Sequence, residues 1–235
     1  MGWLRLGNTR ETKVKDISEQ LRHYRELRAA QQRMHSEALS FLSRKSFKEG
    51  AKELGVLRGD RLVFRSEHEM AVTVDHCLYD LRRNGRTAID RYLAQTRFEE
   101  GTAEFELAAA MRRARYSIFV VEEVQRGAVL SLRDLFRQEP VRLLDQNLSE
   151  TAEVDMSFAS RILLFEDFAM TTGAALPFDK EMGEELSRRA DPRLEREIRK
   201  GLDVAHMTPE QQARFATLTI RVALDLGAGE RIVSH

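Results

Sequence analysis

Five apolar segments in the middle of the chain decide its fold: Tyr116-Ser-Ile-Phe-Val-Val-Glu-Glu-Val124, Val129-Leu-Ser-Leu-Arg-Asp-Leu-Phe136, Val141-Arg-Leu-Leu144, Ser160-Arg-Ile-Leu-Leu-Phe165 and Ala169-Met-Thr-Thr172. Turn or polar residues separate them, as is typical of successive strands. No helical pattern lies between the segments, whereas parallel neighbours need long crossover connections. The sequence therefore predicts an antiparallel, barrel-like module of five or six strands over residues 116–178.

The two flanking regions have the periodicity of helices. From about Thr12 to Leu42, apolar residues recur at spacings of three and four, which predicts one long amphipathic helix. We therefore expect an α+β protein with a mainly helical region over residues 1–115, the β module, and C-terminal helices over residues 179–235. The C-terminal helices are expected to pack back on the N-terminal ones.

Local signals predict where several helices begin. Ser66-Glu-His-Glu69 has the form of a capping box, which satisfies free backbone amides in the first turn. Asp191-Pro192 and Thr208-Pro209 each combine an N-cap residue with proline at the first helical position. We expect a helix to start at each of these three places.

Composition excludes several classes of protein. Lysine plus arginine equals aspartate plus glutamate at 38 each, so no overall charge favours nucleic acid or an acidic partner. The single cysteine, Cys77, excludes an internal disulfide and a four-cysteine zinc site. The start, Met1 to Gly7, has no long apolar run, so we expect neither a signal peptide nor a membrane anchor. These features predict a cytoplasmic protein without a membrane segment.

One predicted helix carries a candidate metal site. His76 and Asp80 are four residues apart and so share a helix face, and His68 lies two turns before Asp75 and His76. Imidazole and carboxylate ligands at such spacing suit a divalent cation. The HExxH pattern of zinc proteases is absent, because Val72 stands at the second histidine position. The alternative to a metal site is structural: His76 lies at the edge of the buried, apolar side of this helix and packs against or hydrogen-bonds to a neighbouring residue.

Other catalytic patterns do not occur. The chain has no Gly-x-Ser-x-Gly motif and no phosphate-binding loop, and Cys77 lies on the apolar stripe of its helix, where a buried, inert thiol is expected. Glu122 and Glu123 are adjacent in a predicted strand and so face opposite sides. The sequence therefore predicts a protein that is not an enzyme and needs no cofactor.

Three basic pairs form a candidate nucleic-acid surface: Arg44-Lys45, Arg82-Arg83 and Arg112-Arg113. Together with exposed aromatic residues of the barrel, they would resemble a platform for single strands. The alternative is that they are ordinary helix-end residues, which the helix dipole favours.

The central part of the chain, from about Leu57 to Phe178, resembles a family of uncharacterised bacterial proteins. The similar segments are Leu62-Val-Phe-Arg-Ser-Glu67, Asp75-His-Cys-Leu-Tyr-Asp80, Tyr116-Ser-Ile-Phe-Val-Val121, Ser131-Leu-Arg-Asp-Leu135 and Met170-Thr-Thr-Gly-Ala-Ala-Leu-Pro177. Similar β modules occur in bacterial proteins with a zinc-binding SEC-C tail. This chain has one cysteine and lacks that tail, so the resemblance implies a fold unit and no zinc site.

Three functional hypotheses follow. The leading one is a non-enzymatic interaction module that uses the barrel rim and the long first helix to bind a protein partner or a second copy. The second is binding of nucleic acid, such as RNA or the ribosome. The third is a metal-dependent hydrolase that uses His68, His76 and Asp80.

Overall fold

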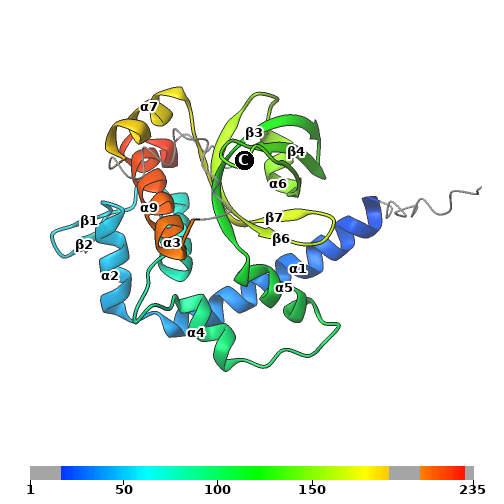
Figure 1. Ribbon diagram of the computed structural model, residues 1–235, viewed down its shortest axis with the longest axis horizontal. Coiled ribbons are helices and arrows are strands. Elements are labelled where there is room, and N and C mark those ends of the chain that lie inside the picture. Colours follow the sequence, from blue (N-terminus) through cyan, green and yellow to red (C-terminus); the bar gives the residue numbers. More distant parts are fainter. Residues whose placement is uncertain (1–16, 191–206, 231–235) are drawn as a thin grey trace, which may run out of the picture.

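The middle of the chain forms a closed five-stranded β-barrel, which Figure 1 shows at the upper right with helices to its left and below it. The computed structural model describes residues 17–190 and 207–230. The strands follow the barrel in the order β3-β4-β5-β7-β6, with the bounds Arg115–Gln125 (β3), Val129–Asp134 (β4), Pro140–Leu144 (β5), Ser157–Leu164 (β6) and Ala169–Pro177 (β7). The predicted α+β class and the barrel at its centre are confirmed.

The barrel is mixed, because one of its five pairings is parallel. β5 and β7 run in the same direction and pair at Leu143 and Ala169, whereas the other four pairings are antiparallel. A short helix, Gln146–Thr151 (α6), takes the chain from β5 to β6, and the Asp145 side chain caps it by accepting a hydrogen bond from Leu148 N at 3.1 Å. The expectation that no helix interrupts the module is therefore wrong, because six residues are too few to show helical periodicity.

Apolar side chains fill the barrel. Phe119 and Phe158, on the neighbouring strands β3 and β6, are both fully buried, with ring centroids 5.7 Å apart. Leucine, valine, isoleucine and alanine side chains from all five strands complete this cluster, as is usual for small barrels. The barrel interior is thus a packed core, and binding surfaces must come from its outside or from the helices.

Helices cover the barrel on two sides (Figure 1). Their bounds are Ile17–Ala38 (α1), Arg44–Glu53 (α2), Glu67–Tyr79 (α3), Ala88–Gln95 (α4), Ala103–Arg112 (α5), Lys180–Arg189 (α7) and Pro209–Asp225 (α9). Shorter elements are the 3-10 helices Leu39–Phe41 (η1) and Ala228–Glu230 (η3) and the hairpin strands Leu57–Arg58 (β1) and Arg61–Leu62 (β2).

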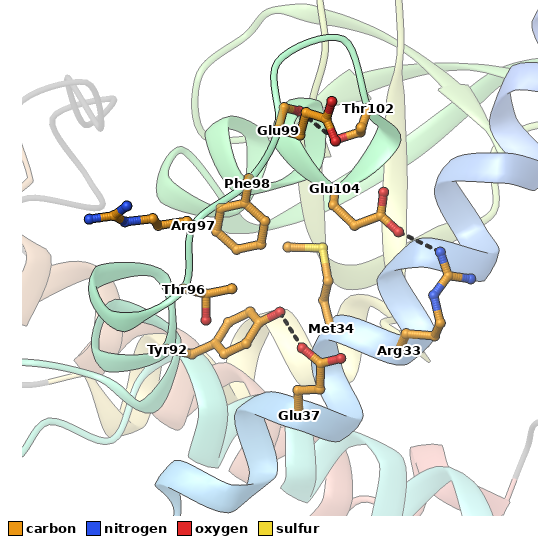
Figure 2. Close-up of a pocket in the computed structure, with 10 residues that line it drawn as sticks. All are labelled: Arg33, Met34, Glu37, Tyr92, Thr96, Arg97, Phe98, Glu99, Thr102 and Glu104. Atoms are coloured by element: carbon orange, nitrogen blue, oxygen red, sulfur yellow. Dashed lines mark hydrogen bonds and ion pairs between the residues drawn. The ribbon is translucent and has the colours of Figure 1, made fainter.

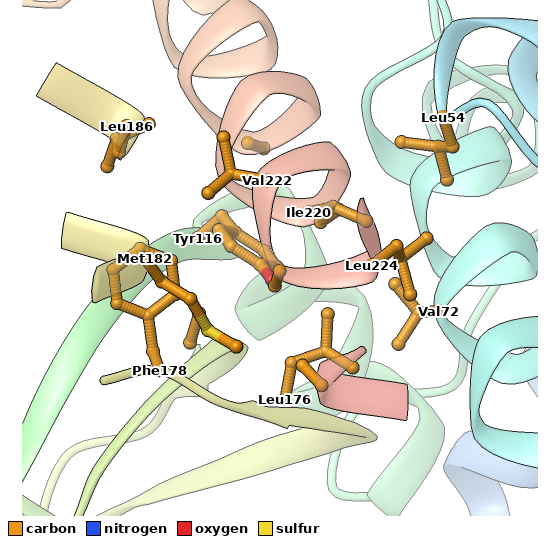
Figure 3. Packing of buried hydrophobic residues seen from close by; sticks show 14 of the residues in the cluster. Leu54, Val72, Tyr116, Leu176, Phe178, Met182, Leu186, Ile220, Val222 and Leu224 are labelled. Atoms are coloured by element: carbon orange, nitrogen blue, oxygen red, sulfur yellow. The ribbon is translucent and has the colours of Figure 1, made fainter. Parts of the chain in front are cut away.

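Two apolar clusters join the helices to the barrel. In the first, Tyr116, Leu176 and Phe178 of the barrel region meet Met182 of α7 and Val222 of α9 (Figure 3). The second, built on Leu27, Met34, Leu78, Leu107 and Leu163, joins α1, α3 and α5 to β6. Because α9 also packs against α3, helices from both ends of the described chain lie side by side.

The apolar stripe of α1 belongs to the protein's own core. Tyr24, Leu27 and Met34 are buried against the second cluster, and Arg28 donates to the backbone oxygen of Thr171 in β7 at 2.7 Å. The sequence predicts that this helix engages a partner, but its apolar face is already covered. Any partner of α1 must use the exposed side or the end of the helix.

Two of the three expected helix starts lie in the described chain. Ser66 accepts a hydrogen bond from Glu69 N, and Thr208 and Gln211 form a capping box. The start expected at Asp191, like residues Met1 to Gly7, lies outside the described residues. Among the described helices, none is both long enough and apolar enough to cross a bilayer.

Candidate functional site

A buried arginine bridges the barrel and α3. Arg161 lies in the middle of β6 and is 4% exposed. Its Nε donates to Asp75 Oδ2 at 2.9 Å, and its Nη2 donates to Asp80 Oδ2 at 2.5 Å. Removing a guanidinium from water costs several kcal/mol, which only close and well-bonded carboxylates offset. These two bonds therefore fix the end of α3 against one position of β6.

Two tyrosine rings complete the surroundings of Arg161. Its guanidinium carbon lies 4.8 Å from the ring centre of Tyr79 and 5.4 Å from that of Tyr116, within cation–π range. Tyr79 belongs to the second apolar cluster and Tyr116 to the first. Arg161 thus lies at the junction of the two cores.

His76 extends this ionic cluster to α2. Its Nδ1 lies 3.3 Å from Asp80 Oδ2, and its Nε2 lies 3.2 Å from Glu53 Oε2. Burial lowers the pKa of His76, but the hydrogen bonds to Asp80 and Glu53 and the charges of both carboxylates outweigh burial and raise this pKa to about 9. His76 is therefore protonated at neutral pH, and both ring nitrogens donate.

The structure brings together only part of the predicted metal site. His76 and Asp80 are in contact, but His68 lies in the first turn of α3, about two turns before His76 and about three turns before Asp80. The described residues contain no group of three or more histidine, cysteine or acidic side chains placed to hold a metal ion. Asp75 and Asp80 bond to Arg161 instead, so their arrangement favours the alternative in which His76 bonds to its neighbours.

The cluster contains one polar atom without a partner. Asp75 Oδ1 is buried and accepts no hydrogen bond within the described part of the chain. Sequence analysis missed Arg161 itself, although a charged residue inside an otherwise apolar strand signals a buried partner. Cys77 is fully buried as predicted, and burial raises the pKa of its thiol to about 12, so it is not nucleophilic at neutral pH.

Two of the three predicted basic pairs lie on neighbouring elements. Arg44 and Lys45 are exposed in the first turn of α2, and Arg83 forms an ion pair with Glu49 of the same helix. Arg82 donates to the backbone oxygen of Gly85 at 2.9 Å. The turn that follows α3 therefore lies against α2, and the two pairs belong to one side of the molecule.

The third pair, Arg112-Arg113, hydrogen-bonds to backbone oxygens of the protein itself. Arg112 donates to the Leu93 oxygen at the end of α4, and Arg113 donates to the Leu164 oxygen at the end of β6, both at 3.4 Å. Their positions at the C-terminal end of α5 agree with the alternative that they are ordinary helix-end residues, which the helix dipole favours.

A pocket of about 270 Å³ lies where α1, α4 and α5 approach one another (Figure 2). Arg33, Met34 and Glu37 of α1 form one wall, Tyr92 of α4 lies opposite, and the segment 96–102 with Glu104 completes the lining. The sequence alone does not predict this pocket. Three helices and a loop supply its lining, so the lining residues form no recognisable local motif.

Carboxylates dominate the charge around the pocket. The Tyr92 hydroxyl donates to Glu37 Oε2 at 2.8 Å. Burial raises the pKa of Tyr92, and the hydrogen bond to Glu37, the charge of Glu37 and the charge of Glu104 raise this pKa further. Arg33 bonds to Glu104 at 2.5 Å, and the lining as a whole has three glutamates and two arginines. The pocket therefore suits a cationic group.

The fold and these two sites define an α+β protein in which helices pack on a small, filled barrel and line the pocket. Residues 18–207 match a family described as a family of unknown function, DUF7986. The match spans most of the chain, so the protein belongs to this family. The comparison with curated proteins and the comparison with solved structures each gave no match.

The ionic cluster predicts a loss of stability at alkaline pH. The pKa of His76 is raised from 6.5 to about 9 on folding, so its contribution is complete below pH 6.5 and is lost as pH rises through 9. We expect the free energy of unfolding to fall by up to about 3 kcal/mol over this range, since one pKa unit corresponds to about 1.4 kcal/mol. Urea unfolding followed by circular dichroism at pH 6, 8 and 10 measures this change.

The His76→Gln variant is the control, because glutamine keeps a hydrogen-bonding side chain that does not titrate. Its stability should vary less with pH than that of the wild type. Equal slopes for the two proteins would show that His76 does not carry the alkaline sensitivity.

Proposed function

We propose that the protein is a non-enzymatic interaction module that binds a protein partner through the pocket between α1, α4 and α5. The observation that carries this proposal is the combination of an aromatic wall with a carboxylate that no cation neutralises among the described residues. Glu37 accepts a hydrogen bond from Tyr92, and the ion pair of Arg33 is with Glu104. An unneutralised carboxylate beside aromatic rings offers a binding site for a cation.

The surroundings of the pocket favour a protein over a small free ligand. Leu39 lies in η1, which follows α1 directly, and Phe105 follows Glu104 of the lining in α5; the two are 40% and 43% exposed. Exposed apolar side chains are typical of the core of an interaction surface. The barrel offers less, since its interior is filled and helices cover the apolar parts of its outer face.

The family resemblance of the sequence supports inferences about the protein's origin, its location and the relatives of its barrel. We infer a bacterial, cytoplasmic protein whose barrel is related to the β modules of SEC-C-tailed proteins. The absence of catalytic sequence patterns supports a binding role over the metal-dependent hydrolase hypothesis with His68, His76 and Asp80, and the bonds of Asp80 to Arg161 and His76 argue in the same direction.

Site-specific photo-crosslinking tests the proposal in cells that naturally carry the protein. We expect a photoreactive phenylalanine analogue at Phe105 to give a defined adduct with one polypeptide, whereas the same analogue at Val154, which is 55% exposed in the loop before β6, gives none. An adduct at twice the chain mass would identify a second copy as the partner.

The pocket variant Phe98→Ala makes this test specific, because it removes one aromatic wall. The Phe105 adduct should disappear in this background. Identical adducts from both positions, or an adduct that survives Phe98→Ala, would contradict docking at the pocket.

Nucleic-acid binding is the second candidate, and the charge distribution favours it on one side of the molecule. Segments 44–62 and 82–91 contain ten basic and four acidic residues, a net charge of +6. Residues 115–177 contain six arginines, no lysine and ten acidic residues, a net charge of −4. The ion pair of Arg83 with Glu49 brings the two basic segments together, so a phosphate backbone would follow α2 rather than the barrel.

Fluorescence anisotropy with a labelled single-stranded RNA tests this second candidate at 50 and 200 mM salt. We expect binding at low salt and a steep loss at high salt, because phosphate contacts release counterions. The double variant Arg44→Gln/Lys45→Gln should bind several-fold more weakly, whereas Arg133→Gln on the barrel should not. No change in anisotropy at low salt would exclude the candidate.

A further inference from the structure

We propose that the pocket receives the guanidinium group of an arginine side chain from the partner protein, an inference that rests on the proposed function. Tyr92 and Phe98 pack edge to face, with ring centroids 6.0 Å apart and an angle of 71° between their planes. Figure 2 shows the Met34 side chain reaching toward both rings from α1. Tyr92 and Met34 are buried behind Phe98, whose ring is partly exposed, so a flat cation can stack on Phe98.

The Tyr92 ring is held in place on several sides. Phe41 of η1 packs edge to face on it at 5.9 Å, and Glu37 fixes its hydroxyl. The side chain is 2% exposed, so its orientation does not depend on a ligand. A pre-formed aromatic wall lowers the entropic cost of binding, because these side chains do not have to be immobilised when the ligand binds.

Among the charged side chains that line the pocket, Glu37 forms no ion pair with a described residue and can bind a cationic ligand. The lining has three glutamates and two arginines. Arg33 bonds to Glu104, and Figure 2 shows the Arg97 side chain pointing away from the other lining residues. Among the described residues, the only hydrogen bond to the Glu37 carboxylate comes from Tyr92 to Oε2. Oε1 therefore remains for an incoming donor.

Arginine fits these features better than lysine does. A guanidinium is planar, stacks on aromatic rings and presents several donors in one plane, whereas an ammonium is a compact and strongly hydrated point charge. The volume of about 270 Å³ is also just below the range of about 300–1,000 Å³ that is usual for small-molecule sites. It suits a single inserted side chain.

The NMR signal of the Met34 methyl group reports binding in the pocket. The chain contains eight methionines, so the full-length protein labelled with ¹³C at the methionine methyl groups gives few signals, and Met34→Leu assigns the relevant one. We propose titrating it with acetyl-arginine amide, acetyl-lysine amide and acetyl-citrulline amide. Citrulline keeps the shape of arginine without its charge.

We expect the Met34 signal to shift with the arginine compound and at least ten-fold less, at equal concentration, with the citrulline compound. The signal of Met182, which is buried in the first cluster, should not move. In Glu37→Gln the apparent affinity for the arginine compound should fall at least ten-fold, although glutamine still accepts the Tyr92 hydrogen bond. Glu19→Gln is the matched control, because it makes the same charge change on the same helix, five turns away.

The outcomes separate this inference from the proposed function. Equal shifts with arginine and citrulline, or shifts that Glu37→Gln does not weaken, would overturn the guanidinium assignment. No shift of Met34 together with a pocket-dependent adduct at Phe105 would also overturn it, while leaving the docking proposal intact. A specific arginine response without any adduct would support the site and contradict the protein partner.

Discussion

The contact between Arg161 and the two carboxylates of α3 is the constraint on which the arrangement of this molecule depends. It places one charged group of β6 against Asp75 and Asp80 inside the protein, where a wrong register would leave charges unpaired at a cost of several kcal/mol. Because α3 packs against α9 and is followed directly by α4, its position on the barrel sets the positions of both helical groups.

The pocket follows from the same arrangement. Tyr92 belongs to α4 and Glu37 to the end of α1, and both helices reach the barrel through the core that includes Leu78 and Tyr79 of α3. The barrel itself is filled by Phe119, Phe158 and their neighbours. Helices pack on its outer face, and the pocket and the basic side chains around α2 lie on these helices and their connecting segments.

The sequence predicts the parts of this fold that depend on local patterns. The strands were identifiable because apolar runs such as Tyr116–Val121 are separated by turn residues. The parallel pairing of β5 with β7 at Leu143 and Ala169, which closes the barrel, could not be predicted, since a single long-range pair leaves no periodic signal in the sequence. For the same reason, the contact of Arg161 with α3 and the convergence of Glu37, Tyr92 and Phe98 escape sequence analysis, because they join residues far apart in the chain.

The urea unfolding of Arg161→Met at neutral pH tests the central claim most directly. Methionine keeps a long apolar side chain but leaves Asp75 buried without a cation and Asp80 with His76 alone, so the free energy of unfolding should fall by about 3–5 kcal/mol. The control is Arg133→Met, which breaks a half-exposed ion pair with Glu122 on the barrel and should cost about 1 kcal/mol at most. Equal stability of the two variants would contradict the claim that Arg161 holds the helices on the barrel.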